Sequence, residues 1–221
     1  MDLSNLYQEI DSGCKLLKLE LSSEIKNKLI DYLQLLIKWN KVYNLTAITD
    51  PKLIIHKHIL DSLAIINFID SKVKNIIDIG TGAGLPGIII AIVKPDLKIV
   101  LLDSNNKKTA FLEQAKNTLK LKNIEIINQR VENYIPEELF DAIISRAFAS
   151  LVDYVVCTEH LLTSSGRIYA MKGKLPDSET VEFKDKCSHN FVINKIFPVE
   201  VPFLVGESRC LLEIKKLIQI K

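Results

Sequence analysis

Apolar side chains recur at helical spacing through the N-terminal part of the chain. Two such runs follow one another, the second preceded by Ser22 and Ser23 as capping residues, and a third begins at the cap-then-proline pair Asp50-Pro51. We therefore expect a helical cap over residues 1–70. Its regularly spaced positions are Leu3, Leu6, Tyr7, Ile10, Cys14 and Leu17, then Ile25, Leu29, Leu33, Leu36 and Ile37, then Ile54, Ile55, His58, Ile59 and Ser62.

Short runs rich in isoleucine and valine alternate with helical patterns from residue 71 onward, which predicts a doubly wound parallel sheet. The last two strands are joined by a loop without room for a helix, so they should be antiparallel. Strands are expected from residue 76 and over 98–102, 124–128, 141–145, 167–172, 191–199 and 209–214, with helices over 86–93, 105–121, 151–162 and 177–186.

The run that starts at Ile76 ends at the carboxylate Asp78 and breaks into a glycine-rich turn over residues 80–87. Gly80, Gly82 and Gly84 permit backbone angles that side chains forbid, and they let a ligand approach the backbone closely. Pro86 suits the first turn of a helix. The free N–H groups of that helix start would hold the polar part of a nucleotide-like cofactor.

Two classes of cofactor fit this turn. Residues 82–87 match the dinucleotide fingerprint G-x-G-x-x-G, which leaves an NAD-binding oxidoreductase as one interpretation. Asp78 before the first glycine and Asp103 at the end of the next strand instead resemble the S-adenosylmethionine site of Rossmann-like methyltransferases, in which the second acid binds ribose hydroxyls. The antiparallel ending favours the second class. The expected fold is thus an α/β, Rossmann-like class I methyltransferase sheet, parallel with an antiparallel C-terminal strand, over residues 71–221.

Further polar residues follow the later strands, where ligands bind in such sheets. Val131 and Glu132 suit adenine, as an apolar wall with a polar edge. Arg146 directly follows an apolar strand and is unfavourable to bury unless it is paired, either in a salt bridge or with a ligand. Lys172 and Lys174 are either solvated charges or contacts for the phosphates of a nucleic-acid acceptor.

Composition narrows the class of protein. With 221 residues, a hydrophobic share of 48% and a formal charge of +2, the chain is an ordinary globular protein whose charge neither requires nor excludes a nucleic-acid partner. No stretch resembles a membrane span or a signal peptide, so we expect a cytoplasmic protein, by default a monomer, without a membrane partner. The four cysteines form no C-x-x-C pair, and neither a disulfide framework nor a metal site is expected.

Several motifs in one order identify a closer resemblance. The segments are Trp39-Asn40, Tyr43-Asn44-Leu45-Thr46, His58-Ile59-Leu60-Asp61-Ser62, the glycine turn, Leu102-Asp103-Ser104, Ser145-Arg146-Ala147-Phe148-Ala149 and Lys172-Gly173. Together they resemble the bacterial ribosomal RNA small-subunit methyltransferase G family, also called glucose-inhibited division protein B. The resemblance covers roughly residues 30 to 175 and does not extend to the last two strands.

This resemblance implies transfer of a methyl group from S-adenosylmethionine to N7 of a guanine in 16S rRNA, with the small ribosomal subunit as partner. It implies cofactor contacts at Gly80, Leu85, Val131, Glu132 and Arg146. Gly82 and Asp103 are added to these contacts from their positions in the sequence.

Guanine N7 carries a lone pair in its neutral form, so the reaction requires alignment and exclusion of water but no catalytic base. Asn44, His58 and Ser62 of the helical cap are candidates to hold the base, although a lone histidine in an apolar helix, such as His58, is more often a packing residue. Arg146 and Lys172 complete the predicted catalytic group. A small-molecule methyltransferase of the same fold and a non-catalytic RNA-binding module remain alternatives.

Overall fold

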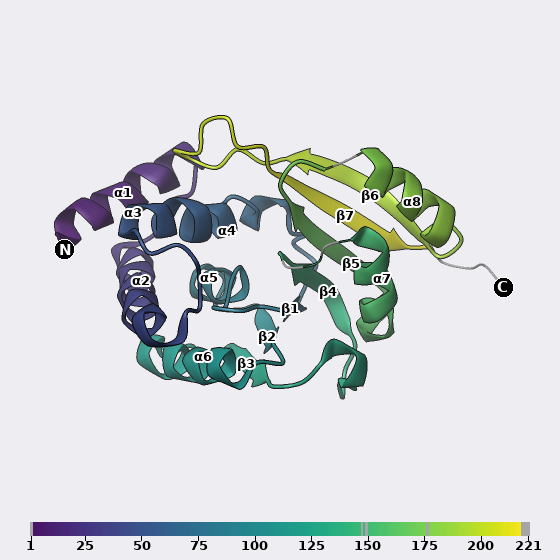
Figure 1. The fold of residues 1–221 in the computed structure, drawn as a ribbon, viewed down its shortest axis with the longest axis horizontal. Helices are drawn as coiled ribbons and strands as arrows, with labels where there is room; N and C mark the ends of the chain where they lie inside the picture. The colour runs from purple at the N-terminus through teal and green to yellow at the C-terminus, as the bar shows by residue number, and fades with distance from the viewer. Residues whose placement is uncertain (1, 147, 149, 176, 218–221) are drawn as a thin grey trace.

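The computed structural model of the chain describes residues 2–146, 148, 150–175 and 177–217 (Figure 1). Within these residues a sheet of seven strands has the order β3-β2-β1-β4-β5-β7-β6. The strands are β1 (Asn75–Ile79), β2 (Lys98–Leu102), β3 (Ile124–Ile127), β4 (Phe140–Ser145), β5 (Leu162–Lys172), β6 (Phe191–Pro198) and β7 (Cys210–Lys216).

Strand directions confirm the predicted fold class. β1 pairs in parallel with β2 and β4, while β7 is antiparallel to both β5 and β6. The short connection between the last two strands leaves no room for a crossover helix, so β7 must reverse direction. Ala147 and Ala149 of the expected Ser-Arg-Ala-Phe-Ala motif lie outside the described residues.

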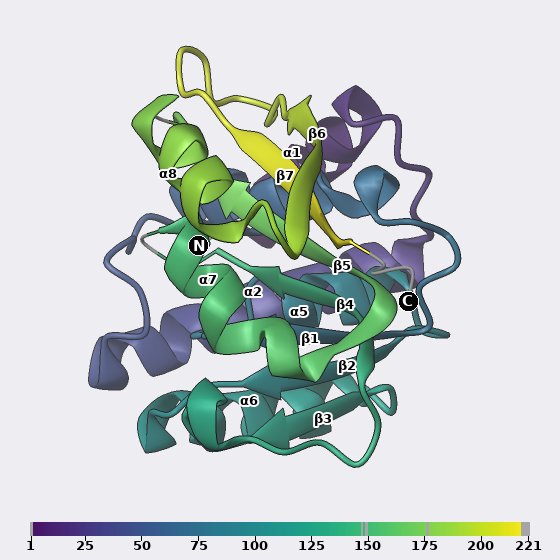
Figure 2. The same ribbon diagram turned by 90° about the vertical axis from the view of Figure 1, so that its right-hand side faces the viewer.

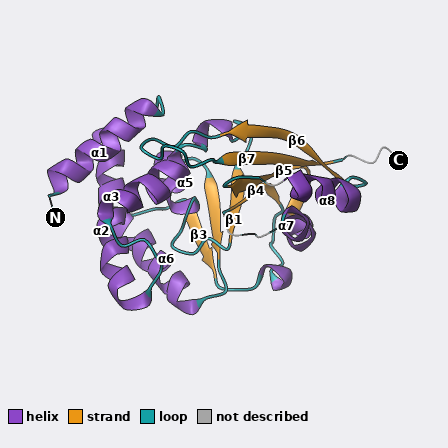
Figure 3. Ribbon diagram, turned by 45° about the horizontal axis from the view of Figure 1, so that its top comes forward, coloured by secondary structure: helices purple, strands orange, loops and turns teal. Residues whose placement is uncertain are grey.

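Helices cover both faces of the sheet. Figures 1 and 3 show α1 to α6 on one side and α7 and α8 on the other, and Figure 2 looks onto the side of α7 and α8. The helices are α1 (Leu3–Leu16), α2 (Ser23–Tyr43), α3 (Pro51–Ile54), α4 (Asp61–Leu63), α5 (Gly87–Val93), α6 (Asn106–Leu119), α7 (Leu151–Thr158) and α8 (Asp177–Cys187). None of the described helices combines the length and apolar character needed to cross a membrane.

Both faces of β1 are covered, which explains its adjacent isoleucines. Ile76 belongs to the core on the side of α2, α5 and α6, whereas Ile77 belongs to the core on the side of α7 and α8. Successive side chains of a strand point to opposite faces, so a strand covered on both faces carries apolar residues at adjacent positions. The polar residues of β1 are Asn75 at its start and the buried Asp78. The first core also contains Ile10 and Leu33 of the N-terminal helices. The division of the chain at residue 70 stays a prediction.

Three elements differ from the sequence-based expectation. The helix expected to reach Leu162 ends at Thr158, and β5 begins at Leu162 instead of Arg167. Leu162 pairs with Phe140 across an irregularity in the β4 and β5 ladder, so a polar segment that resembles a loop enters the strand. The third helix contains a π-helical segment over Ile55–Leu60 between α3 and α4, and its wide turn has no simple signature in sequence.

Tyr32 of α2 connects the N-terminal helices to the glycine-rich turn. Its side chain is fully buried, and its hydroxyl donates a hydrogen bond to the Ala83 carbonyl at 2.7 Å. The ring meets Phe111 of α6 edge-on, with 6.3 Å between the ring centroids. The turn is therefore supported from the helical side by a hydrogen bond that water does not reach.

Replacing Tyr32 with Phe should lower the free energy of unfolding by about 1–2 kcal/mol, because the Ala83 carbonyl would lose this buried donor. Chemical denaturation measures the change. Tyr43→Phe, at a ring that is 41% exposed on the same helix, is the matched control and should change the free energy by less than about 0.5 kcal/mol. Equal effects of the two substitutions would contradict a supporting role for the Tyr32 hydroxyl.

Candidate active site

The glycine-rich turn between β1 and α5 depends on glycine for its shape. Gly80, Gly82 and Gly84 have φ angles of 64°, 62° and 83°, in the left-handed region that other residues rarely adopt. At Gly82 an added Cβ would meet only the Gly80 carbonyl oxygen, 3.9 Å away. The backbone at Gly82 thus borders open space that a ligand can occupy.

The Asp78 side chain of β1 holds this turn through two hydrogen bonds. Its Oδ2 atom accepts hydrogen bonds from the Thr81 hydroxyl at 2.6 Å and from the Gly87 N–H at 2.8 Å. Burial raises the pKa of Asp78 to about 7, although these two donors oppose the rise. The Gly87 N–H at the start of α5 is therefore already bonded to the protein. The expectation that this N–H is free for a cofactor was wrong, because Asp78 reaches it first.

Asp103 lies at the end of β2, on the open side of the turn. Its Oδ2 accepts from the Gly82 N–H at 2.9 Å, and its Oδ1 accepts from the Asn105 N–H at 2.9 Å. The "Asp103 cavity" in front of it has a volume of about 220 Å³. It is lined by Ile79, Gly80, Leu102, Asp103, Ser104, Gln129, Arg130, Val131, Glu132 and Phe148. The structure thus brings the predicted Val131 and Glu132 to the same cavity as Asp103.

A second space, the "His58 cavity", shares Gly80 with the first and has a volume of about 130 Å³. It is lined by Leu45, Thr46, His58, Gly80, Thr81, Gly82, Ala83, Leu85 and Arg146. Four of the predicted cofactor residues, Gly80, Gly82, Leu85 and Arg146, therefore meet here with the predicted His58. An elongated ligand could extend from one cavity to the other across Gly80.

Hydrogen bonds fix the protonation of His58. Nδ1 lies 2.9 Å from the Lys57 carbonyl oxygen and 3.4 Å from Arg146 Nη1. The shorter contact is to a carbonyl that can only accept, so we place the proton on Nδ1. Nε2 then accepts from the Thr46 hydroxyl at 2.8 Å. Burial, reinforced by the charge of Arg146, lowers the pKa of His58 to about 4. At neutral pH the ring is uncharged and orients Thr46 at the edge of the cavity.

The third space, the "Arg209 cavity", has a volume of about 270 Å³ and shares Arg146 with the His58 cavity. Its apolar wall is made by Ile48, Ile65, Met171 and Val199, and its remaining lining residues are Lys57, Asp61, Arg146, Lys172, Gly173, Arg209 and Cys210. A cavity with an apolar wall and several cations suits a planar heterocycle attached to an anionic group.

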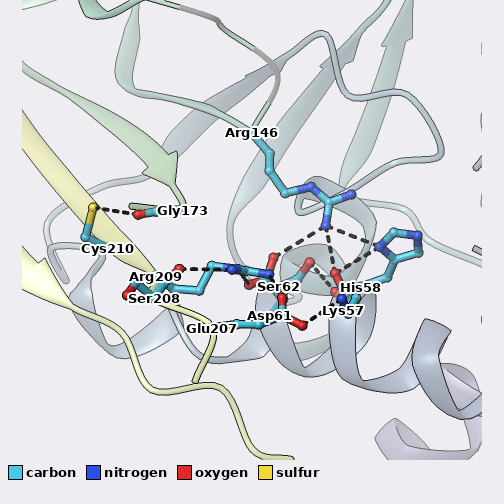
Figure 4. Close-up of polar contacts among 10 residues, drawn as sticks. All are labelled: Lys57, His58, Asp61, Ser62, Arg146, Gly173, Glu207, Ser208, Arg209 and Cys210. Carbon is cyan, nitrogen blue, oxygen red and sulfur yellow. Dashed lines mark hydrogen bonds and ion pairs between the residues drawn. The ribbon is translucent and has the colours of Figure 1, made fainter. Parts of the chain in front are cut away.

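Opposite charges alternate along the edge of this cavity. Arg146 Nη1 lies 3.4 Å from Asp61 Oδ2, and Arg209 Nε lies 3.3 Å from Asp61 Oδ1. Figure 4 shows the two arginines reaching Asp61 from different directions, Arg146 from above and Arg209 from the left. Burial raises the pKa of Asp61 and the two guanidinium groups oppose the rise. The charge of Arg146 is therefore paired inside the protein, while the side chain stays 29% exposed to the cavities.

The other predicted catalytic residues lie in different places. Lys172 lines the Arg209 cavity and forms an ion pair with Glu179 of α8 at 2.7 Å. Asn44 ends α2 in a left-handed conformation, is exposed and lines none of the three cavities. Ser62 is fully buried, and its hydroxyl donates to the His58 carbonyl at 2.7 Å. Neither Asn44 nor Ser62 faces these cavities, and their role in holding a base stays a prediction.

Three residues that line the Arg209 cavity were not predicted as functional from the sequence: Lys57, Asp61 and Arg209. Asp61 follows His58 by one helical turn, a spacing that was available as a signal. Arg209 comes from the C-terminal part of the chain, which carries no motif, and only the return of β7 to the side of β5 brings it to the site. The described residues contain no group of three or more His, Cys, Asp or Glu side chains arranged to hold a metal ion.

Comparison with known proteins identifies the family. The family model described as rRNA small subunit methyltransferase G matches residues 25–211. The chain belongs to this family. The match begins in α2 and ends in β7, so it spans every residue that lines the three cavities, and it confirms the family predicted from the motifs.

Relatives in the rRNA small subunit methyltransferase G family match over most of their length. A ribosomal RNA small subunit methyltransferase G from Legionella pneumophila (strain Corby) is 51% identical over 191 residues, which cover 85% of this chain and 86% of the relative. The protein of the same name from Hydrogenovibrio crunogenus is 47% identical over 207 residues, which cover 94% and 93%.

Solved structures agree with the fold at low sequence identity. An O-methyltransferase from Thermotoga maritima has a TM-score of 0.57 at 17% identity, covering 84% of this chain and 73% of its own. A tRNA methyltransferase from Aquifex aeolicus has a TM-score of 0.56 at 14% identity, covering 72% and 69%. These similarities confirm the methyltransferase fold class of the family member described here.

The pKa of His58 leads to a pH-dependent prediction. In the unfolded chain histidine takes up a proton near pH 6.5, whereas the folded protein resists protonation of His58 down to about pH 4. The stability that neutral His58 contributes to the folded protein is therefore present above pH 6.5 and is lost as the pH falls toward 4. Between these limits the wild type should lose about 2–3 kcal/mol of unfolding free energy relative to His58→Asn.

Denaturation curves at a series of pH values measure this difference. His189→Asn, on the exposed surface, controls for the loss of one histidine. A difference between wild type and His58→Asn that stays constant with pH would contradict a buried, neutral His58.

Proposed function

We propose that this chain transfers a methyl group from S-adenosylmethionine to N7 of a guanine in 16S rRNA. The observation that carries the proposal is Arg146, which lines both the His58 cavity at the glycine turn and the Arg209 cavity next to it. The His58 cavity suits the reactive end of a cofactor, and the Arg209 cavity suits an acceptor nucleotide. The names of the curated relatives support rRNA of the small subunit as the acceptor.

Residues of the Asp103 and His58 cavities would hold the cofactor. Asp103 offers carboxylate oxygens for ribose hydroxyls, while Val131 and Glu132 offer an apolar wall and a polar edge for adenine. The open backbone at Gly82 and the Leu85 side chain would border the amino-acid end. S-adenosylmethionine, when bound, supplies an electrophilic methyl group on a sulfonium.

The residues of the Arg209 cavity would align the acceptor. Guanine N7 attacks through its own lone pair, so none of these residues needs to remove a proton. His58 fits this requirement, because it is uncharged at neutral pH and adds no repulsion beside a sulfonium. Methyl transfer leaves a positive charge on the purine, and Asp61 offsets the cations that surround it. Lys172 is placed to contact an RNA phosphate.

The same proposal includes a location and an assembly state. An acceptor in the small ribosomal subunit implies a cytoplasmic enzyme, and we propose that it acts as a monomer. Asn44 remains a proposed contact of the acceptor RNA on the exposed surface beside the His58 cavity.

A methyl-transfer assay tests the function. Tritiated S-adenosylmethionine is incubated with the protein and with small subunits that lack this methylation, with 16S rRNA alone, or with a mixture of small metabolites. Label should enter 16S rRNA, and nuclease digestion should recover it as 7-methylguanosine. Label found only in metabolites, or only at another atom of guanine, would contradict the proposal.

Arg146→Ala should reduce methyl transfer about a hundredfold or more while the protein stays folded, because both cavities lose the group that they share. Circular dichroism and thermal melting measure the fold on the same preparations. Arg130→Ala, at the far side of the Asp103 cavity, is a matched loss of an arginine and should reduce transfer much less. Transfer by Arg146→Ala at the wild-type rate would remove Arg146 from the mechanism.

Asp103→Asn tests cofactor binding separately. Loss of the charged acceptor should raise the KM for S-adenosylmethionine about tenfold to a hundredfold, while kcat changes little, since the ribose contact is made equally in the ground state and the transition state. Asp96→Asn, at an exposed carboxylate before β2, is the control. A lower kcat at unchanged KM would contradict this assignment.

A further inference from the structure

The Glu207 carboxylate, in the loop between β6 and β7, pairs with two of the cations that line the Arg209 cavity. Glu207 Oε1 lies 2.7 Å from Lys57 Nζ, and Glu207 Oε2 lies 2.8 Å from Arg209 Nη2. Each oxygen of one anionic group thus pairs with a different cation, as the labelled side chains of Figure 4 show. Both cations also line the cavity, but Glu207 does not.

The loop that carries Glu207 is exposed to solvent. Gly206 has a φ of 81° and Phe203 a φ of 68°, and the Val205 side chain between them is 99% exposed. The side chain of Glu207 itself is 37% exposed. An incoming anion can therefore reach the two cations from solvent if the carboxylate moves aside, which a side chain on such a loop can do without disturbing the core.

The residues that line the Arg209 cavity carry an excess of positive charge. Four cations line it, Lys57, Arg146, Lys172 and Arg209, against one acid, Asp61. Asp61 pairs with the two arginines and Glu179 pairs with Lys172. Without Glu207, Lys57 would have no ion-pair partner among the described residues, and Arg209 would keep its ion pair with Asp61 and its hydrogen bond to the Ser208 carbonyl.

We infer that Glu207 occupies the position of an RNA phosphate, and that the acceptor nucleotide enters the Arg209 cavity by exchanging a phosphate for this carboxylate on Lys57 and Arg209. A non-bridging pair of phosphate oxygens offers the same two acceptors to a lysine and an arginine as the Glu207 carboxylate does. The inference rests on the proposed function, because it assumes an RNA acceptor.

The exchange has a consequence for salt dependence. When Lys57 and Arg209 neutralise a phosphate, the RNA releases cations that surrounded it. In the wild type the displaced Glu207 carboxylate stays near that phosphate and retains a cation, so the net release is smaller than in Glu207→Gln. The slope of log affinity against log salt should therefore be steeper in the variant, by about 0.7 for each phosphate bound. Its affinity for RNA at low salt should be higher by about threefold.

Filter binding of a 16S rRNA transcript, with S-adenosylhomocysteine present, measures affinity between about 50 and 200 mM KCl. Glu200→Gln is the matched control, since Glu200 is an exposed carboxylate of the same connecting segment, and it should behave as wild type. Glu207→Ala should repeat the effect of Glu207→Gln. The double variant Lys57→Ala/Glu207→Gln should lose the gain in RNA affinity, because one of the two cations that would hold the phosphate is absent.

A competition experiment with inorganic phosphate distinguishes a free anion from RNA as the ligand of Lys57 and Arg209. At equal ionic strength, phosphate should weaken RNA binding to Glu207→Gln more than chloride does, while the wild type responds equally to both salts. Phosphate that binds but does not compete with RNA would assign the two cations to a free anion and overturn the inference.

The outcomes separate this inference from the proposed function. If the wild type methylates 16S rRNA, but Glu207→Gln and Glu207→Ala bind RNA no more tightly than wild type and with the same salt slope, Glu207 is a structural ion pair and the inference is wrong while the function stands. If the wild type neither binds nor methylates 16S rRNA, both are wrong. Melting curves of each variant verify that the compared proteins are folded.

Discussion

The hydrogen bonds of the Asp78 carboxylate determine the shape of the site. Oδ2 joins the Thr81 hydroxyl to the N–H that begins α5, so the end of β1, the glycine turn and the start of the helix are tied at one buried atom. An added Cβ at Gly87 would lie 2.8 Å from that oxygen, which leaves no room for a side chain. Tyr32 supports the same turn from the opposite side through Ala83. The Asp103 and His58 cavities, which both border this turn, inherit their geometry from this arrangement.

A second constraint comes from the buried carboxylate of Asp61 and the two partly exposed arginines that pair with it. Arg146 follows β4, Asp61 follows the π-helical segment, and Arg209 precedes β7, so three distant parts of the chain meet in one alternating series. A buried charge is tolerated only when it is paired, and these pairs therefore fix the helical cap against the sheet. The series ends at Lys57 and Glu207 on the surface. It connects the His58 cavity to the exposed loop that carries Glu207.

Much of this fold could be predicted from periodicity. The alternation of apolar runs with helical patterns predicted the parallel sheet, and the short final loop predicted the antiparallel β7, because both depend on local spacing. The start of β5 could not be predicted, since an irregular ladder draws polar residues into the strand. Nor could the π-helical turn that carries His58, because its wider hydrogen bonding has no distinct residue pattern.

The site was predictable where a motif coincided with the end of a strand. Asp103, Val131 and Arg146 follow β2, β3 and β4 and line cavities at that edge of the sheet, while their roles stay predictions. Asn44 illustrates the opposite case, because its neighbour Thr46 reaches the His58 cavity while Asn44 ends the helix outside it. Pairs such as Asp61 with Arg209 depend on tertiary structure, and no local pattern in one sequence reveals them.

The central claim is that cofactor and acceptor meet at Arg146. A crystal structure of the protein with S-adenosylhomocysteine tests it most directly. The account predicts adenosine in the Asp103 cavity, the amino-acid end in the His58 cavity, and the sulfur facing the Arg209 cavity beside Arg146. A sulfur atom that faces away from the Arg209 cavity, or a ligand bound outside the Asp103 and His58 cavities, would contradict it.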